Sequence, residues 1–216
     1  MDHLRPAIEA TIKQLADDYR HIPGMILTED DLKCLLVSRL LEIQELRSPR
    51  NTADHVLGTM VHTEVSWFDA KGKLGIKPDI TILDPRGLSI FRALREGYPL
   101  PSKQFNFVGR SIIFELKLIR NKMGATLASV RQVRKDLEKI FRLFDRLSQS
   151  DAADELYCFF VVFSKVDRRV PEFDQLINQA PPHPRCRFIY KTAGVHWPPA
   201  PRQGALRMNG PSTAHS

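Results

Sequence analysis

Two apolar runs of strand-forming residues stand out along the chain because each of them carries charge. They cover residues 77–83 and 112–118, and their apolar and β-branched positions are filled by Ile and Leu, with Thr81 in the first run and Phe114 in the second. This composition predicts buried strands over 76–83 and 111–118. A charged group inside an apolar strand costs several kcal/mol unless a partner binds it. The charged residues of these two strands are therefore the first candidates for a functional site.

Apolar residues recur at helical spacing in three longer stretches, which we predict to be amphipathic helices. The first covers residues 4–19 and ends before the pair Pro23-Gly24. The second starts after Thr28, a good N-cap followed by three acidic residues, and runs to about residue 46. The third covers 126–147 and has the most regular apolar face. Shorter helices are expected at 88–95 and 171–179.

The remaining strands are predicted from alternation and from apolar runs. Residues 61–68 and 76–83 should form a β-hairpin around a turn at 71–73. Residues 156–164 are apolar almost throughout, which is typical of a central strand buried on both faces. A further strand is expected at 187–191. From residue 197 onward Pro, Gly, Ser and Ala predict a disordered tail.

Asp79, Glu115 and Lys117 are the charged residues in the interior of these strands. Residues two apart in a strand point to the same face, so Glu115 and Lys117 project together. Carboxylate oxygens suit a cation such as Mg²⁺, and an ammonium can hold water or a phosphate oxygen. The pattern thus predicts a site for a divalent cation and a phosphate. The alternative is an ion pair at the edge of a strand.

At Pro78-Asp79 and at Glu115-Leu116-Lys117 the chain resembles the PD-(D/E)XK nuclease superfamily, which has a restriction-endonuclease-like fold. The order helix, three strands, helix, strand over residues 28–165 is similar to the core of that family. The resemblance implies an α/β fold in which helices flank a central mixed β-sheet (αβββαβ). It also implies a nuclease that hydrolyses the phosphodiester bonds of nucleic acid, with DNA as the expected substrate and Mg²⁺ or Mn²⁺ as cofactor.

The resemblance further implies roles for individual residues. Asp79 and Glu115 would hold the metal together with the backbone carbonyl of Leu116, and Lys117 would position water or stabilise the transition state. Relatives add a glutamate from the first core helix, for which Glu29 is the candidate, and Glu64 is a second candidate for the acidic cluster. Glu29 could equally serve only the helix terminus, and Glu64 could lie on a solvated strand face.

A glutamine on the long helix helps to order the site in some relatives, and Gln132 is a possible match. The aromatic residue that usually follows four positions later is replaced here by Asp136. For Asp136 and Lys139 we expect an ion pair on the helix surface.

Charge is concentrated in the part of the chain that surrounds the Glu115-Leu116-Lys117 triplet. The chain has 216 residues and a net charge of +7, and between residues 86 and 146 fourteen Lys and Arg stand against five acids. Such an excess favours a polyanionic partner, although a solvated helix face would also be basic. The candidate contacts to nucleic acid are Arg110, Arg120, Lys122, Arg131, Arg134 and Lys135.

Other features narrow the expectations for domains and compartment. We expect an N-terminal helix at 1–24, a nuclease-like domain at 25–196 and a tail at 197–216. Cys34 and Cys158 lie in apolar runs and are expected to be small core residues. Without a secretory signal or an apolar run long enough to cross a bilayer, the chain is expected to be cytoplasmic, with a homodimer or a partner subunit possible.

Two alternatives to a nuclease stay open at this stage. One is a catalytically inactive nucleic-acid-binding or assembly domain on the same fold. The other is a regulatory or scaffolding protein whose basic region docks acidic partners.

Overall fold

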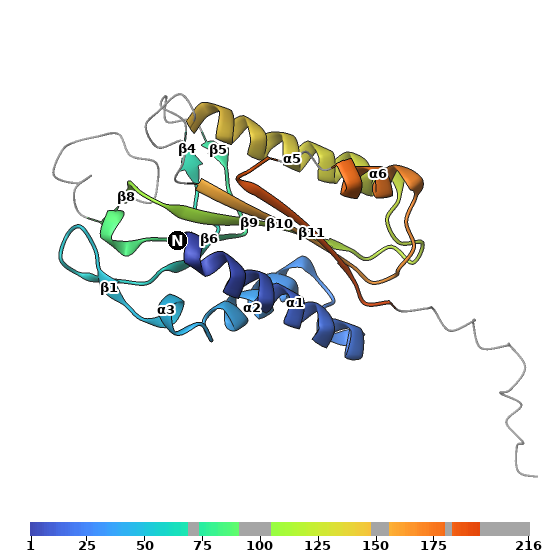
Figure 1. Cartoon of the computed structure of the whole chain (residues 1–216), viewed down its shortest axis with the longest axis horizontal. Coiled ribbons are helices and arrows are strands. Elements are labelled where there is room, and N and C mark those ends of the chain that lie inside the picture. The colour runs from blue at the N-terminus through green and yellow to red at the C-terminus, as the bar shows by residue number, and fades with distance from the viewer. Residues whose placement is uncertain (69–73, 91–104, 148–155, 180–182, 195–216) are drawn as a thin grey trace, which may run out of the picture.

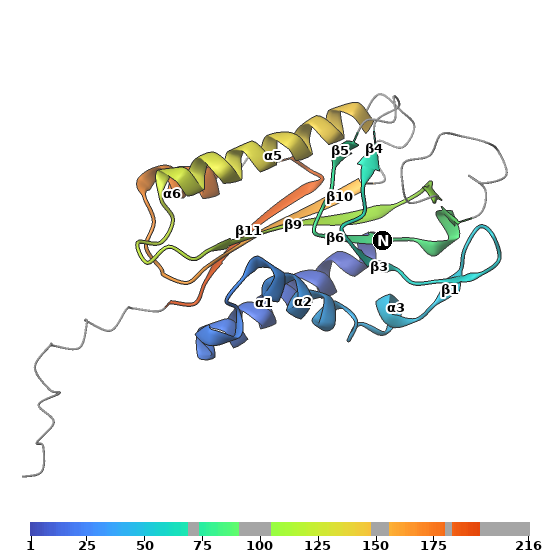
Figure 2. The same ribbon diagram turned by 180° about the vertical axis from the view of Figure 1, so that it is seen from behind.

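The chain folds into an α/β structure in which a mixed five-stranded sheet lies between two layers of helices (Figures 1 and 2). The computed structural model describes residues 1–68, 74–90, 105–147, 156–179 and 183–194. The order of the strands across the sheet is β11 (Cys186–Thr192), β10 (Leu156–Ser164), β9 (Ser111–Ile119), β6 (Ile80–Leu83) and β3 (Val61–Thr63). The strands β9, β10 and β11 are parallel, and β6 runs antiparallel to both of its neighbours.

Each face of the sheet has its own core (Figures 1 and 2). The helices α1 (Arg5–His21), α2 (Glu29–Leu40) and α3 (Gln44–Arg47) cover one face, and α5 (Leu127–Leu147) and α6 (Pro171–Gln179) cover the other. Strand β9 supplies both cores by alternation: Phe114 and Leu116 pack with α1 and α2, whereas Ile113 and Ile119 pack with α5. The helix predicted at 1–24 therefore belongs to the same layer as α2.

Several predictions from periodicity are confirmed closely. Helix α1 ends at His21 before the short 3₁₀ helix η2 (Pro23–Met25), and α5 matches the predicted 126–147. Strand β10 is central and buried, as its apolar sequence predicted. Strand β11 and helix α6 lie where a strand and a helix were expected. Thr28 caps α2 in a capping box with Asp31.

Helix α2 is shorter than predicted. It ends at Leu40 instead of about residue 46, because Ile43 is extended, and α3 starts anew at Gln44. The break changes the direction of the chain so that both Leu40 and Leu46 are buried in the core under the sheet. Cys34 was predicted to be a core residue and is exposed. It lies two positions from Leu32, on the side of α2 opposite to the buried stripe.

The predicted hairpin exists but is interrupted on both of its strands. Strand β3 pairs with β6 inside the sheet, whereas β4 (Trp67–Phe68) pairs with β5 (Leu74–Ile76) in a separate two-stranded ribbon. Glu64 has a left-handed backbone, with φ of 55°, and Pro78 has no N–H with which to continue a ladder. The predicted turn at 71–73 lies outside the described residues.

The long connection between the two motif strands contains strands where a helix was expected. After the 3₁₀ helix η3 (Pro85–Gly87), β7 (Leu88–Ser89) pairs with β8 (Asn106–Phe107), so the predicted helix at 88–95 is wrong at its start. Its remainder lies mostly outside the described residues, as does the predicted tail from 197. A third small ribbon joins β1 (Arg50–Asn51) to β2 (Leu57–Gly58), and the 3₁₀ helix η1 (Asp2–Leu4) precedes α1.

Candidate active site

Two carboxylates take the place of a neighbouring strand along the open edge of β9. Strand β6 pairs with β9 only from Ser111 to Phe114. Beyond that point, the N–H of Leu116 donates to Asp79 Oδ2 at 2.8 Å and the N–H of Leu118 donates to Glu29 Oε2 at 3.1 Å. One oxygen of each carboxylate is thus fixed by the backbone of β9.

The local sequence explains why Asp79 reaches this edge. Pro78 interrupts the ladder directly before it, and the Asp79 N–H then donates to the Phe114 carbonyl at 3.0 Å. Glu29 arrives from the other direction, as the first residue of α2 after the Thr28 cap. The predicted site residues Asp79, Glu29 and Leu116 therefore lie together because Pro78 interrupts the strand ladder and because α2 begins at Glu29.

Glu115 and Lys117 project from β9 toward the α5 side of the sheet. Lys117 Nζ lies 2.8 Å from Glu115 Oε1 and 3.7 Å from Glu29 Oε1. The side chains of Lys117 and Glu115 retain only 18% and 15% of their exposure. An ammonium and a carboxylate that are this buried are mutually dependent, because removing either would leave an uncompensated charge.

Asp136 completes this cluster from α5, although the sequence did not predict it there. Its side chain is 4% exposed, and its Oδ2 lies 3.5 Å from Lys117 Nζ. Gln132 donates to Asp136 Oδ2 at 2.7 Å and Lys139 to Oδ1 at 2.6 Å. The expected surface ion pair with Lys139 exists, but Asp136 is buried and faces the site. Its position between Val133 and Ile140 on the apolar stripe is the signal that could have revealed this.

The charge state of Lys117 follows from its neighbours. Burial disfavours the ammonium, but the attraction and the hydrogen bond of Glu115, with further attraction from Glu29 and Asp136, outweigh burial and raise the pKa of Lys117. Asp136 is held ionised, because the hydrogen bonds from Lys139 and Gln132 outweigh its burial and lower its pKa. Lys117 is therefore a permanent cation at neutral pH.

Asp79 and Glu115 show the opposite behaviour. Burial raises the pKa of the Asp79 carboxyl despite the hydrogen bond from Leu116 and the attraction of Lys117. Burial also raises the pKa of Glu115, and repulsion from Asp79 and Asp136 adds to that effect. The attraction of Lys117 therefore does not fully offset the burial of these two carboxylates.

A divalent cation fits this donor set chemically. Within the described residues, no group of three or more His, Cys, Asp or Glu is arranged to hold a metal. Mg²⁺ usually takes one or two carboxylates together with water and substrate phosphate, and such a pair is what Asp79 and Glu115 provide. The backbone N–H of Leu116 holds Asp79 in this pair, and Glu29 is held two residues farther along β9, by the N–H of Leu118.

Glu64 lies near the cluster but is engaged elsewhere. Its N–H donates to the Asp79 carbonyl at 3.1 Å, while its carboxylate is paired with Lys33, at 2.9 Å, and with Lys77. The hydrogen bonds from Lys77 and Lys33 lower the pKa of Glu64 to about 2. Glu64 thus links Lys33 of α2 to Lys77 of the interrupted hairpin, and both of its carboxylate oxygens are occupied by these lysines.

The predicted basic contacts divide into two groups. Arg120 and Lys122 follow β9 directly, beyond Leu118. The structure does not bring the others to the site: Arg110 precedes β9, roughly 23 Å of strand from Lys117, and lies 4.0 Å from Asp2. The remaining three, all exposed on the outward side of α5, are Arg131, Arg134 and Lys135.

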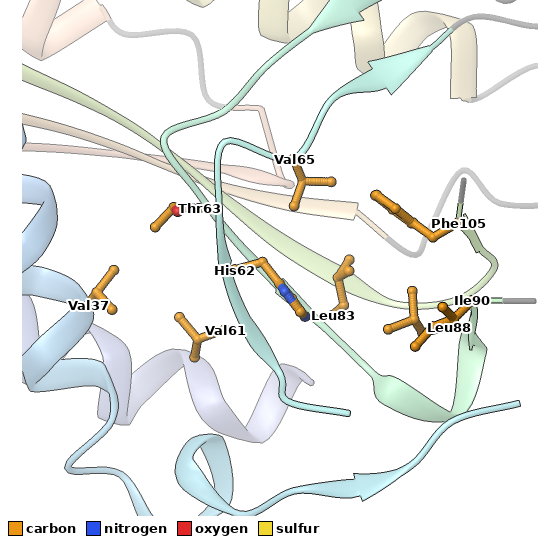
Figure 3. A pocket seen from close by; sticks show the side chains of 9 residues that line it. All are labelled: Val37, Val61, His62, Thr63, Val65, Leu83, Leu88, Ile90 and Phe105. Atoms are coloured by element: carbon orange, nitrogen blue, oxygen red, sulfur yellow. The ribbon is translucent and has the colours of Figure 1, made fainter. Parts of the chain in front are cut away.

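A mostly apolar hollow lies beside β3 (Figure 3). It has a volume of about 600 Å³ and is lined by side chains such as Val37, Val61 and Phe105, with His62 at its side. The described residues that line it include neither Asp79 nor Glu115 nor Lys117. The polar cluster, and not this hollow, therefore carries the candidate chemistry.

Comparison of the chain with family models, with curated proteins and with solved structures gives no match. Among the described helices, none combines the length and the apolarity that a membrane span requires.

Proposed function

We propose that this chain is a divalent-metal-dependent nuclease that hydrolyses phosphodiester bonds of nucleic acid, DNA in the first instance, on a restriction-endonuclease-like core. The observation that supports it best is the meeting of Asp79 with Glu115 and Lys117 at the point where β6 leaves β9. Two strands far apart in sequence bring a carboxylate pair and a buried ammonium to one place. An ion pair at a strand edge, which is the alternative, would not require a second buried carboxylate.

Each residue has a distinct role in the proposed reaction. A divalent cation bound to Asp79 and Glu115 would lower the pKa of water and offset the charge of the phosphate. Asp79 is held in place through Leu116, so its free oxygen is oriented before substrate arrives. Lys117 stays protonated, so it contacts the phosphate and stabilises the charge that develops on its oxygens, and it does not accept the proton of the attacking water.

The direct test is cleavage by purified protein with Mg²⁺, with Mn²⁺ and with chelator. Plasmid, linear duplex and single-stranded DNA, together with single-stranded RNA, serve as substrates. The parent should cut only with a cation. Lys117→Ala and Glu115→Gln should lose orders of magnitude in rate while still binding nucleic acid, because Lys117 acts mainly in the transition state. Lys117→Arg should not restore cleavage, since a planar guanidinium presents its donors differently.

Lys13→Ala is the matched control, because Lys13 is an exposed lysine on α1, remote in sequence from this cluster. Melting curves establish that each variant is folded. Cleavage by Lys117→Ala at the parental rate would show that this cluster is not the active site. Salt-dependent binding without cleavage in the parent would favour an inactive nucleic-acid-binding domain, and no binding at low salt would favour an acidic protein partner.

A further inference from the structure

Three basic side chains surround a small pocket at the end of the sheet, beyond the candidate active site. The loop after β9, the loop after β10 and the η2 segment after α1 all contribute residues to its lining. The pocket has a volume of about 220 Å³. It is lined by Arg120, Lys122, Lys165, Pro23, Leu27 and Val166.

The three cations of this pocket lack a carboxylate partner among the described residues. Within the part of the chain that the structure describes, none of the three lies within 4.0 Å of a carboxylate. Lysines nearer the carboxylate cluster differ in this respect, since Lys33 and Lys117 are both paired. Three positive charges with no described carboxylate beside them repel one another, so an anion at the mouth of the pocket would be stabilised by all three.

The backbone that carries these cations is fixed by hydrogen bonds. The Lys165 N–H donates to the Ile119 carbonyl at 3.1 Å, directly beside Arg120. Lys122 lies in a turn closed by Gly124 N–H to the Asn121 carbonyl at 2.8 Å. A site whose backbone is already ordered loses little conformational entropy when it binds a ligand.

The pocket lies next to the candidate active site along β9. Leu118, whose N–H binds Glu29, precedes Arg120 by two residues, and Leu27 precedes Glu29 by two. Two residues of extended chain span roughly 7 Å. The pocket also lies at the carboxyl ends of the parallel strands β9 and β10, where α/β sheets commonly bind ligands.

We propose that this pocket binds a backbone phosphate of the substrate strand, next to the bond that the candidate active site would cut. The proposal rests on the proposed nuclease function for the identity of that strand. The inner wall of the pocket is mostly apolar, so the phosphate would lie at its mouth, among the charged ends of the three side chains. Leu27, which lines the pocket and is 55% exposed, gives it an apolar surface for the sugar.

The test compares two triple variants that remove the same charge. Arg120→Ala/Lys122→Ala/Lys165→Ala empties the pocket of cations, and Arg131→Ala/Arg134→Ala/Lys135→Ala removes three exposed cations from α5. Binding of fluorescent twelve-nucleotide DNA and RNA strands is measured in chelator over a range of salt, so that cleavage plays no part. The pocket variant should lose about tenfold or more in affinity and lower the salt slope by about one unit. The α5 variant should lose less than about threefold.

Each outcome separates this proposal from the nuclease proposal. Equal losses in the two variants, with a parent that cuts, would overturn the pocket and leave the nuclease. A loss confined to the pocket variant, with a parent that never cuts, would keep the pocket and overturn the nuclease. A parent without affinity for either strand at low salt would overturn the pocket. If the triple variant melts early, Lys165→Glu alone gives the same comparison.

Discussion

Lys117 lies within reach of carboxylates from three different elements. Glu115 is its neighbour on β9, Glu29 comes from the start of α2, and Asp136 comes from α5. Asp79 is near enough to feel the same ammonium. At the scale of single residues the site is therefore rich in negative charge, and its protonation and its response to cations should be measurable apart from catalysis.

Asp79→Asn tests this charge balance. Because burial raises the pKa of Asp79, the folded protein binds more protons than the unfolded chain above about pH 4. The unfolding free energy of the parent therefore falls as the pH rises through the raised pKa, and it stays lower above it. In chelator at pH 7, Asp79→Asn should melt higher than the parent, with a difference that shrinks toward pH 4. Added Mg²⁺ should raise the melting temperature of the parent more than that of the variant.

Asp84→Asn is the control of opposite sign. The hydrogen bond from Arg86 outweighs burial and lowers the pKa of Asp84, so its carboxylate stabilises the fold above the usual carboxyl pKa. That stabilisation is lost as the pH falls through the lowered pKa, and it is absent in the variant. Asp84→Asn should thus melt lower than the parent at pH 7.

For the metal assignment, the decisive comparison is the response of the melting temperature to Mg²⁺. An equal response in Asp79→Asn and in the parent would contradict the assignment of Asp79 as a metal ligand.

Asp136→Ala should be costly because Asp136 is buried and holds three partners. Its loss leaves Gln132 unpaired and removes one counter-charge from Lys117, which should cost about 3 kcal/mol in unfolding free energy. Lys139→Ala removes the exposed partner of the same carboxylate and should cost less than about 1 kcal/mol. Urea unfolding measures both values. Equal losses of unfolding free energy would mean that Asp136 contributes no more than an ion pair on the helix surface.

At the scale of elements, the loop between β9 and α5 depends on one glycine. Gly124 has φ of 73°, and a Cβ added there would lie 1.7 Å from the Arg168 carbonyl oxygen. That carbonyl accepts the N–H of Ala125 at 2.8 Å, which ties the loop to the segment before α6. The loop can hold Lys122 in place only while this close approach is possible.

Gly124→Ala should destabilise the fold by about 3 kcal/mol, because left-handed backbone costs an alanine about 1–2 kcal/mol and the Arg168 contact must also open. Gly194→Ala is the matched control: its φ is 65°, but nothing lies within 4 Å of the added Cβ. It should therefore show the backbone cost alone, about 1–2 kcal/mol. Urea unfolding compares the two, and an equal effect would mean that the approach to Arg168 carries no strain.

At the scale of the whole molecule, a single sheet joins two cores that contain different helices. Leu15 of α1 is buried in one core and Leu137 of α5 in the other. The strands β9 and β10 contribute side chains to both, so unfolding either layer exposes the sheet that the other requires. The two layers should therefore unfold together.

Leu15→Ala and Leu137→Ala should each lower the unfolding free energy by about 2–5 kcal/mol within one transition. Leu57→Ala, at a side chain that is 71% exposed, should change it by less than about 1 kcal/mol. Helical circular dichroism and tryptophan fluorescence followed in the same urea titration report the transition. Separate transitions in Leu15→Ala would show that α1 is not part of the cooperative unit.

Elements with strong periodicity could be predicted from the sequence, and interruptions could not. Strand β10 and helix α5 carry their apolar pattern locally, so their bounds follow from it. The end of α2 at Leu40 has no Gly or Pro to mark it, because it depends on how Leu46 reaches the core. The break in the hairpin at Glu64 likewise depends on bonds to Asp79 and Lys33, which are distant in sequence.

The layered α/β architecture and the three central candidates, Asp79, Glu115 and Lys117, could be predicted from the amino-acid pattern, because charge in an apolar strand is visible locally. Which other side chains join them depends on how the elements pack in three dimensions. This packing turned Asp136 toward Lys117, occupied Glu64 with lysines and placed Lys165 beside Arg120. The reason is that the rotation of a helix against a sheet, and the meeting of loops, are fixed by packing between distant segments.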